Sequence, residues 1–441
     1  MYVPRGKSIF HKDRGVGGPY RSVVLVLVIF GLIFMLRSVD SGAIQPFFIP
    51  TYTPTRTFDS YATEGETHFI AGDLNQAIAA YQQALQIEPD NADLWAELAR
   101  IQVYSSTLLI TDQTKRARLE EASQSVDNAI AAEPENSTAW AVKAFALDWL
   151  AEPGLVGDEW QALLTQAEQA AVKAIQIDNQ NTLALAYYAE VLVDQQKWLQ
   201  ADQNIEQAVQ RDPSLMDVHR INGYVQESLG NYSEAVGEYL RAVEINPNLT
   251  FLYMSIGVNY RNLRQYDLAL EYFAKAAVIN EQLGVQDPIP YLSIANTYVQ
   301  QGQFFSAGLN ARKGLRLDPE NPDVYARLGV IYHNARNYEG AIPALKCAIR
   351  GCTAQEACDV RECDPATEPM VAIEGLLLSI NTKDYYLTYS SALAGMHRDS
   401  NGYCIEAMEI TKMLKKDYYD DEILMSNVEE NETICNNAGY Y

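Results

Sequence analysis

Positive charge is scarce in this 441-residue chain, which has 33 Lys and Arg against 57 Asp and Glu and a net charge of −24. The first 37 residues hold six Lys or Arg and one Asp, so the remainder carries about −29. Such a surface repels phosphate backbones, and the composition therefore argues against nucleic acid as a partner. The excess charge favours solubility and basic partners.

Catalytic signatures are also missing. The sequence has no G-x-S-x-G, H-E-x-x-H, Walker or C-x-x-C-H motif. Its five His are scattered, and Asp and Glu are too abundant to single out an acid–base pair. We therefore expect no enzyme activity and no cofactor, since catalysis would require an unrecognised site within 351–441.

Cysteine is absent from the first 346 residues, and six then follow: Cys347, Cys352, Cys358, Cys363, Cys404 and Cys435. An even number in an exported domain suggests disulfides, although six cysteines allow fifteen pairings. We expect at least one pair among Cys352, Cys358 and Cys363, and a link between Cys404 and Cys435. Cys347 is either a core residue or a partner for that loop. The C-x5-C-x4-C spacing and the lack of a nearby His do not fit a zinc site, so no metal is expected.

The chain has one long uncharged apolar run, at 22–36, between Arg21 and Arg37. Its 15 residues fall short of the roughly 20 that span a bilayer. However, Tyr20 can sit at the interface and both arginines can extend to water. We predict a transmembrane helix at 22–37 with a basic cytoplasmic tail at 1–21, so that the later residues are extracytoplasmic, in a periplasm or at the cell surface. A cleaved signal peptide ending near Ser41–Ala43 is the alternative. The Pro- and Thr-rich segment 38–57 reads as an extended stalk.

Small residues recur with a regular period beyond the stalk. Ala201, Ala235, Ala269, Ala307 and Ala341 are spaced by 34, 34, 38 and 34 residues. In the unit from Thr250, one helical stripe contains Tyr253, Ile256, Gly257 and Tyr260, and a second contains Ala269, Phe273 and Ala276. This spacing predicts two amphipathic helices joined by a turn at 262–266, with Gly257 and Ala269 small because the helices approach closely. His219 occupies the position that Trp140, Tyr253 and Tyr325 hold in other units, so we interpret it as a packing residue.

This pattern resembles the tetratricopeptide repeat family, whose period is 34 residues. Eight units fit 58–350, two of them expanded by insertions, at 92–136 and 137–181. A degenerate ninth follows near Gly395 and Ala407, within a cysteine-bearing cap at 351–441. The resemblance implies an all-α fold: a right-handed superhelical α-solenoid of helix pairs, preceded by one transmembrane helix. Insertions in solenoids often lie at binding surfaces, although loops without a role are the simpler interpretation here.

The resemblance also implies that the first helix of each unit lines a concave groove. The positions on that helix left free by packing are Arg220, Tyr224, Phe251, Met254, Arg261, Leu292, Asn296, Arg327 and Val330. Such a surface can hold an extended peptide or a helix. The family's pattern for binding chaperone carboxylates is not reproduced, because the matching lysines and paired asparagines are missing.

We therefore expect a membrane-anchored extracytoplasmic scaffold that binds protein or peptide partners through its groove. Self-association into a surface filament or envelope layer is one alternative, and an accessory subunit of a membrane complex is another.

Overall fold

The computed structural model describes residues 19–40 and 56–440 of the chain. These residues belong to two units, Met1–Arg56 and Thr57–Tyr441. Most of the predicted basic tail and of the predicted stalk lies outside the described residues.

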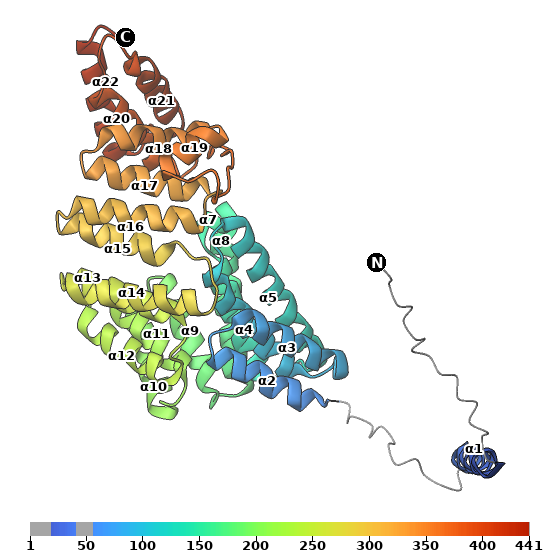
Figure 1. The fold of residues 1–441 in the computed structure, drawn as a ribbon. Helices are drawn as coiled ribbons and strands as arrows, with labels where there is room; N and C mark the ends of the chain where they lie inside the picture. The colour runs from blue at the N-terminus through green and yellow to red at the C-terminus, as the bar shows by residue number, and fades with distance from the viewer. Residues whose placement is uncertain (1–18, 41–55, 441) are drawn as a thin grey trace, which may run out of the picture. The chain divides into compact units, whose positions relative to one another are not determined.

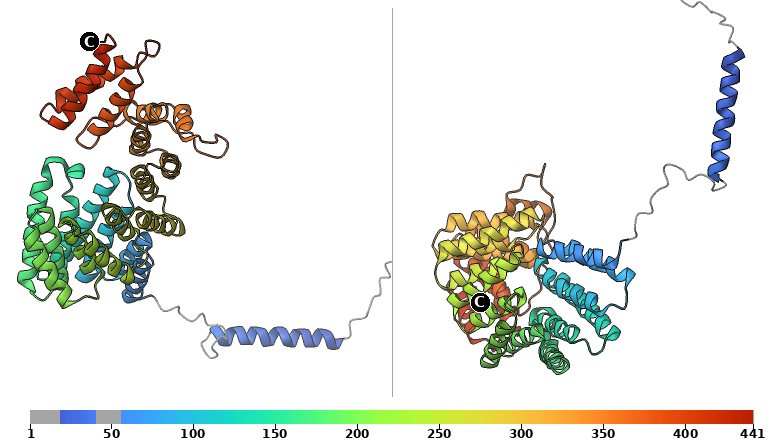
Figure 2. Two further views of the ribbon diagram at one scale, coloured as in Figure 1. Left: turned by 90° about the vertical axis from the view of Figure 1, so that its left-hand side faces the viewer. Right: turned by 90° about the horizontal axis from the view of Figure 1, so that it is seen from below.

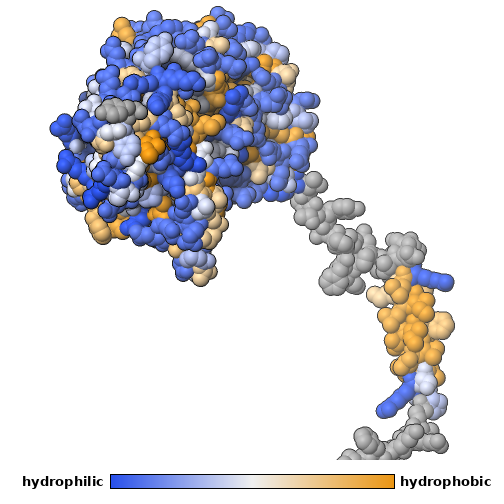
Figure 3. Space-filling model, turned by 90° about the horizontal axis from the view of Figure 1, so that it is seen from above, coloured by the Kyte–Doolittle hydropathy of each residue, from blue (hydrophilic) through white to orange (hydrophobic). Residues whose placement is uncertain are grey.

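Helix α1 (Pro19–Asp40) extends the apolar run at both ends. Its stretch Pro19–Ser38 is long and apolar enough to cross a membrane. At 1.5 Å per residue, a 22-residue helix is about 33 Å long, which matches the hydrocarbon core of a bilayer. Apolar side chains cover its surface all round, with polar side chains at both ends (Figure 3).

The second unit begins with eight helix pairs in succession (Figure 1). They are α2 (Phe58–Ile70) with α3 (Leu74–Ile87), α4 (Ala92–Ser105) with α5 (Asp112–Ala132), α6 (Ser137–Leu150) with α8 (Trp160–Ile177), α9 (Thr182–Asp194) with α10 (Trp198–Arg211), α11 (Met216–Ser228) with α12 (Tyr232–Ile245), α13 (Thr250–Asn262) with α14 (Tyr266–Gln282), α15 (Ile289–Gln300) with α16 (Phe304–Leu317), and α17 (Pro322–Asn334) with α18 (Tyr338–Arg350). The described residues therefore form an α-solenoid.

The repeated glycines allow the two helices of a pair to touch. A Cβ atom built on Gly257 would lie 2.5 Å from the ring of Phe273, closer than real contacts allow. Gly65 faces Tyr81, Gly223 faces Tyr239, and Gly329 faces Leu345 in the same way. The small residue on the first helix thus receives a large side chain sixteen positions later, which explains why both recur with the period.

A further hydrogen bond recurs where one pair follows another. Trp140 Nε1 donates to the carbonyl of Pro134 (2.9 Å), and the Tyr253 hydroxyl donates to that of Pro247 (2.7 Å). His219 Nε2 lies 2.8 Å from the carbonyl of Pro213, and its Nδ1 lies 2.7 Å from Glu238. The hydrogen bond with Glu238 raises the pKa of His219, against the effect of burial. His219 is therefore a buried structural residue.

The two expanded units differ from each other. In the first, the 3₁₀ turn η1 (Ser106–Leu108) precedes a long second helix, α5. In the second, the segment 151–160 contains the short helix α7 (Pro153–Val156) and the turn η2 (Gly157–Glu159). A Cβ on Gly154 would lie 2.7 Å from Nδ2 of Asn381, so α7 contacts the cap.

The solenoid curls until its beginning meets its sixth pair (Figure 2). Asn248 Nδ2 donates to the carbonyl of Ile70 (3.1 Å), across 178 residues. The rings of Tyr104 on α4 and Phe251 on α13 stack with centroids 5.3 Å apart. The first helices α4, α6, α9 and α11 contact one another in succession, so the inner face of these repeats forms a nearly closed ring.

The cap contains three disulfides: Cys347–Cys352, Cys358–Cys363 and Cys404–Cys435. The first ties α18 to the following loop, where Cys352 and Ile373 exchange backbone hydrogen bonds of 3.0 and 2.9 Å. The second closes the end of α19 (Ala354–Arg361). The third joins α21 (Tyr403–Asp417) to α22 (Glu422–Asn437), which follow α20 (Lys383–Gly395).

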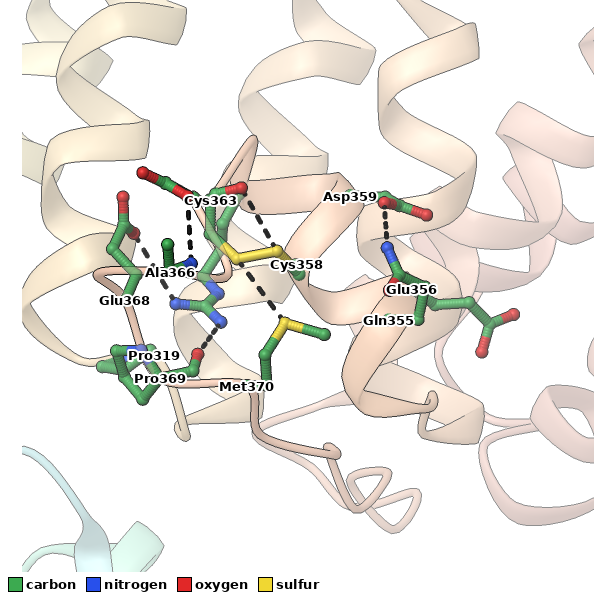
Figure 4. The surroundings of a disulfide bond; sticks show 12 residues. Pro319, Gln355, Glu356, Cys358, Asp359, Cys363, Ala366, Glu368, Pro369 and Met370 are labelled. Carbon is green, nitrogen blue, oxygen red and sulfur yellow. Dashed lines mark hydrogen bonds and ion pairs between the residues drawn. A yellow bond between two sulfur atoms is a disulfide. The ribbon is translucent and has the colours of Figure 1, made fainter.

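A buried arginine holds the loop after α19. The Arg361 side chain is 1% exposed, and its Nη2 donates to the carbonyl of Pro369 (2.6 Å). Figure 4 shows Pro369, Glu368 and Met370 beside the Cys358–Cys363 disulfide. The loop is thus fixed by covalent and polar contacts together, and it covers the end of the eighth helix pair.

Candidate functional site

The interior of the curled repeats is filled by a polar and aromatic network. The guanidinium of Arg220 donates to both oxygens of Glu190 (2.7 and 2.6 Å), and its Nε donates to the Tyr104 hydroxyl (3.1 Å). Trp149 Nε1 also donates to Glu190 (3.0 Å). Arg220 and Glu190 are both buried, and a buried pair of this kind is stable only with such complete hydrogen bonding.

A second buried carboxylate closes the network. Asp217 accepts from Arg100 Nη1 (2.9 Å) and from the Tyr187 hydroxyl (2.6 Å). Tyr104 also donates to it. Burial alone would raise the pKa of Asp217, but the charges of Arg100 and Arg220 and the tyrosine hydrogen bonds hold it below the ordinary value. This carboxylate is ionised and fully paired.

Beside the network lies a pocket of about 580 Å³. Its walls come from η1 and from α6, α7, α8, α9, α11, α12 and α13, together with the two residues between α6 and α7. The lining includes Thr107, Asp148, Trp149, Pro153, Trp160, Glu190, Asp194, Arg220, Tyr224, Tyr239 and Phe251. Both expanded units therefore contribute to it, one through Thr107 and the other through Pro153 and Trp160.

Asp148 is a residue of the pocket wall whose carboxyl group makes no hydrogen bond. It is 4% exposed, and neither carboxylate oxygen has a hydrogen-bond partner. Burial raises its pKa well above the usual value, as do the charges of Asp194 and Glu190, while Arg220 acts in the opposite direction. Asp194 lies at the open side and accepts from the Tyr224 hydroxyl. Desolvation raises the pKa of Asp194 to about 6.

Three of the predicted groove residues, Arg220, Tyr224 and Phe251, meet at this pocket. The sequence placed them on a groove, but Arg220 is buried with Glu190 rather than free to meet a partner. Asp148, Glu190 and Asp194 were missed. Their signal is one or two acidic residues inside a strongly apolar helix, as in AVKAFALDWL before Ala151 and TLALAYYAEVLVD at 182–194.

The other predicted groove residues do not join the pocket. Met254 packs half-buried beside Ala269 and Phe273, and the Arg261 guanidinium lies 5.6 Å from the Phe273 ring centroid. Leu292 is 2% exposed and belongs to the core, which rules out the groove role predicted for it. Asn296 is exposed, Arg327 pairs with Asp323 at 2.6 Å, and Val330 packs half-buried on the second core.

Stacked helix pairs, each packed against the next, define an α-repeat protein whose neighbouring units support one another. Family models support a narrower assignment. A TPR repeat model matches residues 65–103, and tetratricopeptide repeat models match 189–249, 252–282 and 292–355. The chain is a tetratricopeptide-repeat protein.

Individual relatives and solved structures resemble parts of the chain. The formate-dependent nitrite reductase complex subunit NrfG of Escherichia coli O157:H7 is 36% identical over 64 residues, which are 14% of this chain and 32% of that protein. The chain thus matches about a third of that relative's length. A tetratricopeptide repeat protein from Parabacteroides merdae is 16% identical with a TM-score of 0.37, covering 62% of this chain and 98% of that one. A thermophilic TPR protein from Thermus thermophilus is 17% identical with a TM-score of 0.37, covering 50% and 100%.

Proposed function

We propose that the chain is a membrane-anchored scaffold whose repeats lie outside the cytoplasm and bind protein partners. Tetratricopeptide repeats are protein-interaction modules, and the observation that carries the proposal is the open pocket on the inner face of the curled repeats. A preformed concave surface with aromatic walls and a few polar groups is the usual form of a binding site. The proposed activity is binding, and it involves no chemical step.

The proposed location rests on α1 and on the cap. Arg21 and Arg37 bracket the apolar stretch of α1, and the preceding residues are basic, which favours a cytoplasmic amino terminus. The five cysteines of the cap and Cys347 on α18 are all paired in disulfides, which persist in oxidising compartments.

A phosphatase reporter that is active only outside the cytoplasm tests this topology. Fused after Tyr441, it should be active, and mass mapping of native protein should find the three disulfides. An inactive reporter together with six free thiols would contradict the proposed location.

Crosslinking in intact cells tests the binding role. A photo-crosslinking amino acid placed at Thr107, on the pocket rim, should capture a defined partner, whereas one placed at exposed Asp90 should not. Equal capture from both positions would argue against a specific site in the curled repeats.

The match to NrfG favours a second candidate, an accessory subunit of a membrane complex. In that case the protein should migrate on a native gel of mild-detergent extracts with integral membrane proteins in fixed stoichiometry. Migration as a free monomer would contradict this role. Negative-stain images with long polymers would instead support the filament alternative.

A further inference from the structure

The charges in the pocket do not balance. Asp148, Glu152, Glu190 and Asp194 line it, and Arg220 is the basic residue among the lining side chains. Both carboxylate oxygens of Glu190 already accept hydrogen bonds from the guanidinium of Arg220. Asp194 has the neutral Tyr224 hydroxyl, and Asp148 has no hydrogen-bond partner. The pocket therefore has an excess of carboxyl groups that lack a counter-charge.

Asp148 shows that this excess of carboxyl groups includes a buried side chain of the pocket wall. Buried polar groups in proteins are nearly always hydrogen-bonded, and a buried carboxyl without a partner is costly. With 4% exposure and a place in the pocket wall, Asp148 has lost water without gaining a protein donor. A donor that entered the pocket from outside would supply both the missing hydrogen bonds and the missing positive charge.

The aromatic residues of the pocket wall indicate which class of hydrogen-bond donor the pocket would bind. Trp149, Trp160 and Phe251 line the pocket, and aromatic faces attract organic cations. The network already uses this chemistry, since the Arg220 guanidinium lies 5.2 Å from the Phe145 ring centroid and 5.7 Å from that of Trp149. Within the described residues, no group of three or more His, Cys, Asp or Glu could hold a metal ion.

We propose that this pocket binds an organic cation, an alkylammonium or guanidinium group, which donates to Asp148 and lies against the tryptophan rings. Such a group occurs in the Lys and Arg side chains of a partner and in free amines. The peptide source rests on the partner-binding role proposed above, whereas a free amine does not.

Binding should be linked to protons. Burial, Asp194 and Glu190 raise the pKa of Asp148, and Arg220 acts against them. Tyr224 and Tyr239 are the remaining titratable groups of the inner wall, and Glu152 is exposed at the rim. A bound cation favours the ionised form of Asp148, so it displaces a proton, and affinity should rise as the pH is raised from about 5 to about 8.

The full-length protein in detergent micelles provides the test. Binding would be measured by titration calorimetry and tryptophan fluorescence with agmatine, with spermidine, and with a peptide whose two ends are blocked and which carries one central Arg. The same peptide with Gln in place of Arg is the control. We expect the cationic probes to bind and the Gln peptide not to bind. Preference for the Arg peptide identifies a partner side chain as the source, and preference for the amines identifies a free ligand.

Variants locate the binding. Asp148→Asn should weaken binding at least tenfold and reduce its pH dependence to the part that comes from Asp194, while Asp90→Asn, at an exposed position, should leave binding unchanged. Trp160→Leu provides an independent probe of the wall. Absence of binding by the wild type, or full binding by Asp148→Asn, would overturn the inference. If crosslinking at Thr107 still captures a partner in that event, the scaffold role stands and only the cation site fails.

Discussion

Single residues explain both the regularity of this chain and its main departure from regularity. Gly257 and Phe273 were predictable as a packed pair, because short-range periodicity places them on facing stripes. The packing role of His219 was predictable for the same reason, whereas its hydrogen bond to the carbonyl of Pro213 was not predicted. Asp148 was not predictable, because the pocket around it is also formed by α11 and α13 of later pairs, which only the curled chain brings near α6.

Replacing Gly257 with Ala should destabilise the protein. The added Cβ would meet the Phe273 ring at 2.5 Å, and overpacking of this kind costs roughly 1–3 kcal/mol. The free energy of unfolding, measured in urea, checks this. Gly237→Ala on α12 is the control, because its Cβ meets nothing within 4 Å and should stabilise by about 0.5–1 kcal/mol. No loss of stability in Gly257→Ala would contradict the close contact with Phe273.

Asp148→Asn should raise the melting temperature at pH 8 and leave it nearly unchanged at pH 4. The pKa of Asp148 is raised in the folded state, so its contribution to stability is complete below the unfolded value of about 3.9 and is lost as the pH rises through the folded value. The amide cannot ionise and avoids that loss. Melting curves at both pH values, with Asp90→Asn for comparison, measure the difference. A variant that is less stable at pH 8 would show that the carboxylate has a partner.

At the scale of elements, the turn inside each of the six regular pairs has a fixed geometry but variable residues. Gly72, Gly230 and Gly302 take a left-handed backbone there, with φ of 80°, 81° and 73°. Gln196, Arg264 and Arg336 hold the equivalent positions with φ of 60°, 59° and 56°. The turn itself was predictable at 262–266, but its left-handed residue was not, because Arg carries no sequence signal for that conformation.

Arg264→Gly should therefore stabilise the repeats by roughly 1 kcal/mol, since relief of the left-handed strain exceeds the added freedom of the unfolded chain. Thermal unfolding monitored by circular dichroism would show the gain. Gly230→Ala is the converse change in open space and should lower the melting temperature. No gain at Arg264 would mean that its side chain makes contacts that offset the strain.

At the scale of the whole unit Thr57–Tyr441, the buried apolar residues form two large clusters and two small ones. One large cluster, the amino-terminal core, extends from Phe69 to Ile256, and the other extends from Leu292 to Cys435. Eight helix pairs could be counted from the sequence because each depends on its own period. The curling that brings Asn248 to Ile70 could not be predicted from the sequence. It results from small angles between successive helix pairs, which add up over six pairs.

Arg100→Met should destabilise the amino-terminal core by about 3–5 kcal/mol, because it leaves buried Asp217 without its ion-pair partner. Hydrogen exchange should show faster opening across α2 to α13 while α17 to α22 stay protected. Lys173→Met removes an exposed pair with Glu135 and should cost less than about 1 kcal/mol. Uniform loss of protection along the whole unit would instead indicate a single cooperative structure.

The pocket draws its walls from positions as far apart as Thr107 and Ser255. A ligand that fits the pocket would bind only the curled form of the chain and would hold five successive repeats together. The ligand concentration would then determine, by mass action, what fraction of the molecules has the curled repeats open. Resistance to proteases would rise with ligand supply, so the abundance of the protein could follow the availability of what it binds.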